Sequence, residues 1–319
     1  MVKTSILSLA AVLVACGGTG ALKDQAREAM PSKDTVQTGG PGSAHPGLAP
    51  EGPQSDSAAG TPSQWKDITV GVAATFNLST VFALGLVESI TAQEPTSCDA
   101  TSCTWGPGPS ALDNNTFKMV VTKNGAKFDY ALSGEPLSKP GSGFVTILSG
   151  SATPTGTPHH GSGTFTVDFD AAAKLDHPGT DTGKLSVTYT NVGPANLQVS
   201  FPGAKDHDHP GQVDNIVYAY QADATGGGDM DVAVHNTTSD VRVSVHSRWK
   251  ADGQGRSDVG YKFASGGVAV DATLSECWGI APFNVVYFSS NKEAYLGPNS
   301  GAEASCAFTP ASYSSKTAP

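Results

Sequence analysis

The stretch that decides the fold is VRVSVHSRW, residues 241–249. Its odd positions carry valine, valine, valine, serine and tryptophan, while its even positions carry arginine, serine, histidine and arginine. Alternation with a period of two is typical of a β-strand that has one buried and one solvated face. The stretch therefore predicts a strand over 241–249.

The same alternation recurs along most of the chain and is interrupted by turn residues. Lys123-Asn124-Gly125 separates two such runs, and Asn-Gly is the strongest short-range signal of a hairpin. Short connections between successive strands favour an antiparallel meander. Strands are predicted near 117–122, 127–132, 144–149, 163–170, 184–190, 196–201, 213–220, 230–235, 241–249, 259–263, 268–274 and 283–288.

A sheet with one apolar face needs a cover, and the segment Ile68 to Gln93 offers an apolar helix. Asn77 or Ser79 would cap this helix and Pro95 would stop it. We expect a mostly β fold, an antiparallel meander that forms a curved, half-barrel-like sheet around this helix. A β-sandwich is the alternative. Residues 68–87 carry no charge, so a membrane span competes with the core helix, although several threonines oppose it.

The first residues of the chain predict export. Lys3 precedes a short apolar run, and Leu13-Val14-Ala15-Cys16 follows it. This tetrapeptide resembles the lipobox of bacterial lipoprotein precursors. The resemblance implies a signal peptide over 1–15 and a mature chain that begins at Cys16, carrying palmitate-type acyl chains that anchor it in a membrane. Gly17 follows the cysteine in place of the aspartate that retains such proteins in the inner membrane, which favours the outer membrane.

Composition divides the mature chain into two parts. Residues 16–64 are rich in Gly, Pro, Ser and Ala, and no aromatic residue occurs before Trp65. Such a segment buries too little apolar surface to order itself, so we expect a disordered tether. Residues 65–319 would then form a single antiparallel β domain. The formal net charge of −10 argues against nucleic acid as a partner.

Five cysteines leave an even number once Cys16 is lipidated. In an exported chain the other four indicate two disulfides, and we favour Cys98–Cys103 and Cys277–Cys306. Zinc is the alternative for four cysteines, but the spacing of 277 and 306 is far from that of zinc sites.

Histidines and carboxylates are the remaining candidates for chemistry. Three loops carry histidines that would form a metal site if they met at one edge of the sheet. Calcium is a second candidate, at 223–231 and 252–258, where hairpin turns are the competing explanation. Asp168 and Asp170 would serve a glycosidase if they faced a cleft, against a solvated strand face. The histidines concerned are His159, His160, His177, His207 and His209.

One cluster of unusual residues resembles a pattern of uncharacterised myxobacterial lipoproteins, SRW…GxGRxD…CW…VY, with Cys98, Cys103 and Trp105 further upstream. The resemblance carries no known activity. We interpret the cluster as a hairpin in which Arg256 pairs with Asp258 while two tryptophans pack near Cys277.

The sequence contains no G-x-S-x-G, phosphate-binding or dinucleotide-binding motif, and it implies no cofactor. We therefore expect a membrane-tethered envelope lipoprotein that is not an enzyme and that acts as a binding or structural module. The alternatives are an envelope hydrolase and a carrier that holds a lipid or another apolar ligand in the concave sheet. The sequence does not indicate the ligand or the protein partner.

Overall fold

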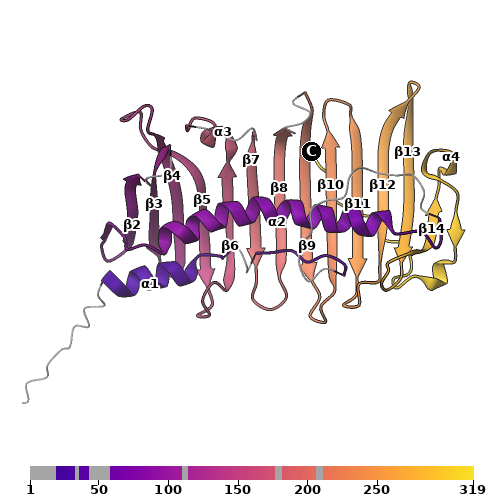
Figure 1. The fold of residues 1–319 in the computed structure, drawn as a ribbon, viewed down its shortest axis with the longest axis horizontal. Coiled ribbons are helices and arrows are strands. Elements are labelled where there is room, and N and C mark those ends of the chain that lie inside the picture. Colours follow the sequence, from indigo (N-terminus) through magenta and orange to yellow (C-terminus); the bar gives the residue numbers. More distant parts are fainter. Residues whose placement is uncertain (1–18, 33–35, 43–57, 110–113, 177–181, 206–210) are drawn as a thin grey trace, which may run out of the picture.

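The computed structural model describes residues 19–32, 36–42, 58–109, 114–176, 182–205 and 211–319. Their main feature is one 15-stranded sheet in which each strand pairs with its neighbours in sequence (Figure 1). All pairings are antiparallel. The sheet is an open meander, because β1 and β15 each have a single neighbour. The predicted mostly β meander is confirmed, and the sandwich alternative is wrong because all strands belong to one sheet.

The strands follow one another along the chain. They are β1 (Ser97–Cys98), β2 (Ser102–Pro109), β3 (Asn115–Asn124), β4 (Lys127–Pro136), β5 (Val145–Pro154), β6 (Gly161–Asp168), β7 (Lys184–Thr190), β8 (Asn196–Lys205), β9 (Val213–Ala222), β10 (Gly228–Asn236), β11 (Val241–Trp249), β12 (Gly255–Ser265), β13 (Val268–Trp278), β14 (Val285–Ser290) and β15 (Ser300–Gly301). The helices are α1 (Thr19–Ala29), α2 (Gln64–Thr91), α3 (Phe169–Ala172), α4 (Glu293–Leu296) and the 3₁₀ turn η1 (Glu303–Ser305).

Tight turns set the register of the hairpins. Asn124 pairs with Lys127 across the turn that begins at Gly125, whose φ of 66° lies in the left-handed region. Ser265 pairs with Val268, and the two glycines between them have φ of 59° and 79°. Two consecutive residues with positive φ form the turn that matches the twist of a two-residue hairpin. The hairpin predicted at Asn124-Gly125 is confirmed, but its two turn residues are Gly125 and Ala126, since Asn124 still belongs to β3.

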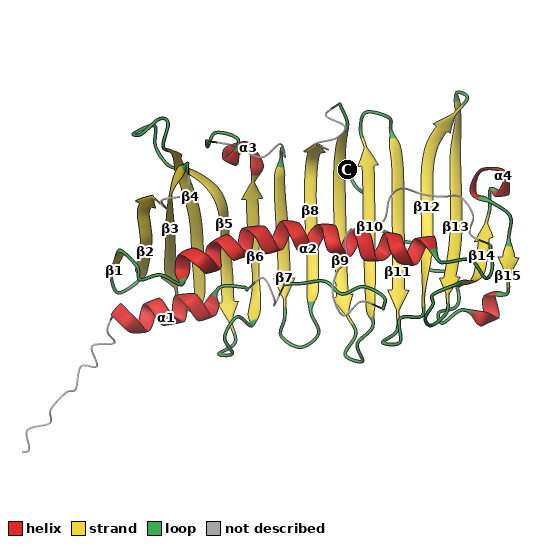
Figure 2. Ribbon diagram, in the orientation of Figure 1, coloured by secondary structure: helices red, strands yellow, loops and turns green. Residues whose placement is uncertain are grey.

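Helix α2 runs across the strands on one face of the sheet, which we call the inner face (Figure 2). Ser63 caps it by accepting a hydrogen bond from the backbone N–H of Lys66. The helix therefore begins before the predicted Ile68, and the expected caps Asn77 and Ser79 lie inside it. Among the described residues, none of the helices combines the length and the apolar character that a membrane crossing requires.

The inner face holds the core. Apolar residues occupy consecutive cross-strand positions on it, so that Phe165 pairs with Val187, Val187 with Val199, and Val199 with Tyr218. Helix α2 packs on this row, where its Phe76 stacks on Tyr218 with ring centroids 4.2 Å apart. Burial of such side chains stabilises the fold by about 1.5–3 kcal/mol each.

Part of the predicted tether also packs on the inner face. Helix α1 lies beside β2 to β5 (Figure 1), and Leu22, Ala26 and Met30 are buried in the core. Arg27 donates hydrogen bonds to the carbonyl oxygens of residues 91, 92 and 93 at the end of α2, where the helix dipole favours a cation. The prediction of a disordered segment over 16–64 is therefore wrong for 19–32, 36–42 and 58–64, which belong to the folded body.

Candidate functional site

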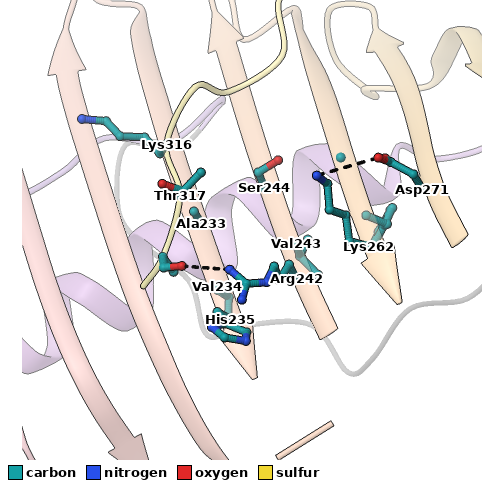
Figure 3. Close-up of a pocket in the computed structure, with 13 residues that line it drawn as sticks. Ala233, Val234, His235, Arg242, Val243, Ser244, Lys262, Asp271, Lys316 and Thr317 are labelled. Atoms are coloured by element: carbon teal, nitrogen blue, oxygen red, sulfur yellow. Dashed lines mark hydrogen bonds and ion pairs between the residues drawn. The ribbon is translucent and has the colours of Figure 1, made fainter. Parts of the chain in front are cut away.

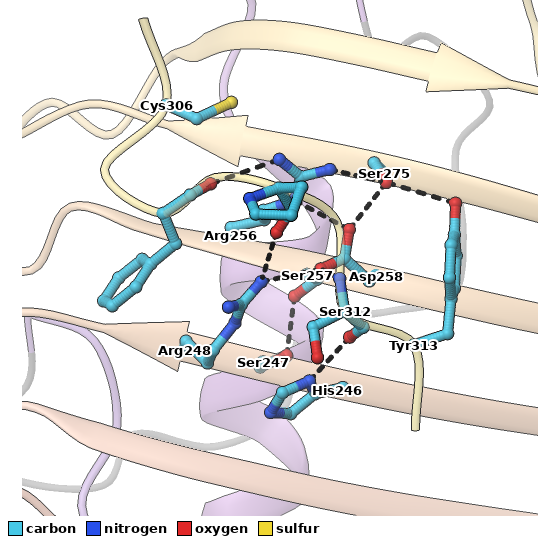
Figure 4. Close-up of polar contacts among 12 residues, drawn as sticks. His246, Ser247, Arg248, Arg256, Ser257, Asp258, Ser275, Cys306, Ser312 and Tyr313 are labelled. Atoms are coloured by element: carbon cyan, nitrogen blue, oxygen red, sulfur yellow. Dashed lines mark hydrogen bonds and ion pairs between the residues drawn. The ribbon is translucent and has the colours of Figure 1, made fainter. Parts of the chain in front are cut away.

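A buried charged cluster lies on the opposite, outer face of the sheet (Figure 4). Arg256 and Asp258 on β12 are 1% and 0% exposed, and the Arg256 Nε lies 2.7 Å from the Asp258 Oδ1. Arg248 reaches the other carboxylate oxygen at 3.0 Å, and the Ser275 hydroxyl donates to Asp258 at 2.6 Å. The predicted Arg256–Asp258 pair is confirmed. The predicted tryptophans both lie on the inner face, where Trp278 donates to the Gly253 carbonyl.

Residues 307–319, which we call the C-terminal tail, cover this cluster. The Arg256 guanidinium donates to the Phe308 carbonyl at 3.1 Å and the Arg248 guanidinium to the Pro310 carbonyl at 3.4 Å. The backbone N–H of Ser312 donates to Asp258 at 2.9 Å. Burial lowers the pKa of Arg256, but the hydrogen bonds that it donates to Asp258 and Glu303 outweigh the effect of burial and raise that pKa. Arg256 therefore stays charged. Each of its guanidinium nitrogens has a hydrogen-bond partner, whereas the buried Nε of Arg248 has none among the described residues.

Two histidines hold the rest of the C-terminal tail. His246 on β11 contacts the Ser312 carbonyl oxygen through Nδ1 at 2.6 Å and the Asp229 carboxylate through Nε2 at 3.1 Å. His235 on β10 contacts the Pro319 carbonyl oxygen through Nδ1 at 2.7 Å and Asp240 through Nε2 at 3.0 Å. Each imidazole thus joins a carboxylate to the backbone of the tail.

A groove of about 300 Å³ runs between the C-terminal tail and strands β10 to β13 (Figure 3). Lys262 and Asp271 form an ion pair at its edge with 3.8 Å between nitrogen and oxygen. The Arg242 guanidinium donates across it to the Ala318 carbonyl at 3.5 Å. The tail is one wall of this groove, so any ligand in it would contact residues 316–318.

Further along the outer face, the central parts of strands β5 to β8 present uncharged polar side chains in register, and the Asp168–Lys184 ion pair bounds them at one end of β6 and β7. Ser151 pairs with Thr164, Thr164 with Thr188, and Thr188 with Gln198. All members of the array are exposed or half-buried. We call this array the polar face; its members are Ser149, Ser151, Thr153, Ser162, Thr164, Thr166, Ser186, Thr188, Thr190, Asn196, Gln198 and Ser200.

No family model, curated protein or solved structure matches the chain. Its site is therefore described by its own chemistry. The two predicted disulfides are present, Cys98 bonded to Cys103 and Cys277 to Cys306. The second joins β13 to Cys306, the residue directly before the C-terminal tail. Cys16 and the rest of the predicted signal sequence lie outside the described residues.

Of the predicted histidine site, the structure describes only the loop with His159 and His160, which joins β5 to β6. His159 is used to hold α1, since its Nδ1 contacts the Met30 carbonyl at 2.9 Å. His177, His207 and His209 themselves lie outside the described residues.

The predicted carboxylate sites are occupied by local hydrogen bonds. Asp168 is the last residue of β6, where it pairs with Lys184 at 2.8 Å and caps α3. Asp170 lies in α3 and not on a strand face as expected, and it accepts from the backbone N–H of Gly183. Asp223 accepts from the backbone and hydroxyl of Thr225, which lowers its pKa. Asp252 accepts from the backbone of the residue two positions on. These contacts are those of capping and turn residues.

One further group brings possible metal ligands together. Asp229, Asp231 and His246 place ligand atoms within 4.8 Å of one another. Both ring nitrogens of His246 are already hydrogen-bonded, one of them to Asp229. The arrangement is that of a carboxylate–imidazolium pair, so we do not assign these residues as metal ligands. Sequence reasoning missed this pair, although alternation alone places both residues on solvated strand faces.

Proposed function

We propose that the chain is an envelope lipoprotein, anchored through acyl chains on Cys16, whose sheet is a non-catalytic binding or structural module. The lipobox sequence supports the anchor, and the outer membrane is the location that Gly17 favours. The observation that supports a binding or structural module is the polar face. This part of the sheet is open to solvent, and none of its members has a charged side chain. We infer that partners meet the protein on this face.

The two alternatives that the sequence left open fit the geometry less well. A carrier of an apolar ligand needs a free concave surface, but α2, α1 and residues 36–42 pack on the inner face. A hydrolase needs a base that can reach substrate. His246, the imidazole best oriented by a carboxylate, has both ring nitrogens hydrogen-bonded and lies against the C-terminal tail.

The anchor is tested by feeding cells radiolabelled palmitate and comparing the native chain with a Cys16→Ser variant. We expect label and membrane association in the native chain and loss of both in the variant. A Cys98→Ser/Cys103→Ser double variant is the matched control, since it removes thiols but leaves position 16 intact. Label that persists after Cys16→Ser would refute the anchor.

The module is tested separately by native mass spectrometry of the protein purified in its Cys16→Ser form. We expect the mass of the polypeptide alone. A co-purified lipid, released only on unfolding, would favour the carrier and count against a filled inner face.

A further inference from the structure

The C-terminal tail is held by two histidines with the same arrangement of partners. In each case Nδ1 faces a main-chain oxygen of the tail and Nε2 faces a carboxylate, and the oxygen of Pro319 also accepts from the Asn215 amide. The side chains of His235 and His246 are both 12% exposed, so water replaces neither contact freely. They lie on adjacent strands, β10 and β11, and hold the tail at residues 319 and 312.

The two contacts of each ring require two protons. A carbonyl oxygen and an ionised carboxylate only accept hydrogen bonds, and a neutral imidazole carries one N–H. Only the imidazolium donates to both partners at once. Loss of one proton leaves one nitrogen lone pair facing an oxygen lone pair, which breaks that hydrogen bond.

We propose that the C-terminal tail is a pH-sensitive strap, held to the outer face at residue 312 while His246 is protonated and loosened there when His246 loses a proton. Three hydrogen bonds that do not involve a histidine, Ser312 to Asp258, Arg242 to Ala318 and Asn215 to Pro319, keep the loosened tail near the sheet. The part before residue 312 stays in place, because the Cys277–Cys306 disulfide and the Arg256–Phe308 contact do not titrate in this range. The device lies outside the polar face and is independent of the function proposed above.

Charged groups around His246 come from three strands. Asp231 lies directly opposite it on β10 and Asp258 on β12, while Arg248 follows two positions later on its own strand. The charge of Asp258 is balanced by two arginines. Asp229 and Asp231 therefore dominate the electrostatic field at the imidazole ring of His246. Burial lowers the pKa of His246, but the hydrogen bonds to Asp229 and Ser312 and the two carboxylate charges raise it above 6.5 overall.

Around His235 the charged groups are Asp240, Arg242 on the neighbouring strand, and Lys316 of the tail, which lines the same groove. Asp240 also pairs with Arg242 at 3.6 Å. The carboxylate is therefore shared between a permanent cation and the imidazole.

The direction of the effect follows from the raised pKa of His246. A group whose pKa is higher in the folded state stabilises that state fully below its unfolded value, and the stabilisation is lost as pH rises through the folded value. The strap is therefore fastened in acid and loosens as the pH rises through the raised pKa of His246.

The experiment is hydrogen–deuterium exchange on the full chain, read as the protection of residues 312–319 relative to the unfolded chain at the same pH. We expect the protection to fall roughly tenfold between about pH 5.5 and about pH 8.5, because a hydrogen bond to a charged group is lost. Protection of residues 259–275 serves as the internal reference and should not change. Equal protection of 312–319 at both pH values would overturn the proposal.

Two variants separate the proton argument from simple loss of contacts. His235→Gln/His246→Gln should leave the tail poorly protected at every pH. Asp229→Asn/Asp240→Asn should keep it protected at high pH, because an amide N–H donates to the neutral Nε2 while Nδ1–H still donates to the tail. A pH-dependent loss that survives in the asparagine variant would refute the strap.

His160→Gln is the matched control, since His160 is exposed and contacts only the Pro158 carbonyl in its own loop. It should keep the native pH dependence. The measurement is repeated with a chelator present, and a pH dependence that vanishes there would assign the effect to a bound metal and overturn the proposal.

Discussion

Substitution of Asp258 by alanine tests the buried cluster most directly. The carboxylate is fully buried and accepts hydrogen bonds from Arg256, Arg248, the Ser275 hydroxyl and the Ser312 backbone. Its removal leaves the guanidinium of Arg256, which is 1% exposed, without its buried counter-ion, and only the half-exposed Glu303 still pairs with it. Breaking a buried ion pair in this way costs about 3–5 kcal/mol. For a chain of this size the loss corresponds to a melting temperature lower by roughly 10 °C.

The assay is thermal or urea unfolding followed by circular dichroism, with disulfides intact. Asp271→Ala is the matched control, because the Lys262–Asp271 pair lies on the same face but both side chains are mostly exposed. Such exposed ion pairs contribute little to stability. The melting temperature of the control variant should therefore be close to that of the native protein. Equal shifts for the two variants would refute the argument that burial makes the cluster important.

Three further outcomes are expected. Ser63→Ala removes the cap of α2 and a hydrogen bond to a buried glutamate, and it should lower the free energy of unfolding in urea by about 1–2 kcal/mol. Ser89→Ala is the control, because the Ser89 hydroxyl is exposed, and it should change this free energy little. Gly255→Ala places a Cβ 2.4 Å from a tryptophan ring and should destabilise by about 1–3 kcal/mol, whereas Gly85→Ala in open space on α2 should stabilise by about 0.5–1 kcal/mol. Burial raises the pKa of Tyr261 to about 12, so stability should fall as pH rises above 10 and fall less in Tyr261→Phe, measured by urea unfolding at each pH.

The strands were predictable because alternation is a local signal. Each of the twelve predicted runs corresponds to one of the strands β3 to β14. The missed strands β1 and β15 have two residues each, too few for a period to register, and β2 contains a Gly-Pro-Gly-Pro run without alternation. The disulfides followed from cysteine parity, and the Arg256–Asp258 pair from its position in a strand.

The errors arose where composition was averaged over a segment. Leu22, Ala26, Ala29 and Met30 have helical spacing, but they lie in a stretch whose glycine and proline content predicts coil. Their burial depends on a docking surface formed by strands more than 70 positions later in the sequence. The position of the C-terminal tail was not predicted for a similar reason. Its backbone is held by side chains of β10 to β12, and its own sequence shows no periodicity of apolar residues.

An open sheet of this width normally offers two rows of unpaired backbone groups on which another molecule can add a strand. Here the outermost strands are Ser97–Cys98 and Ser300–Gly301. Cys98 is tied to β2, and the chain soon after β15 is tied back by Cys306. The two edge strands are therefore too short to pair with a strand of another molecule. Many copies close together on one surface would remain separate and would not join into one continuous sheet.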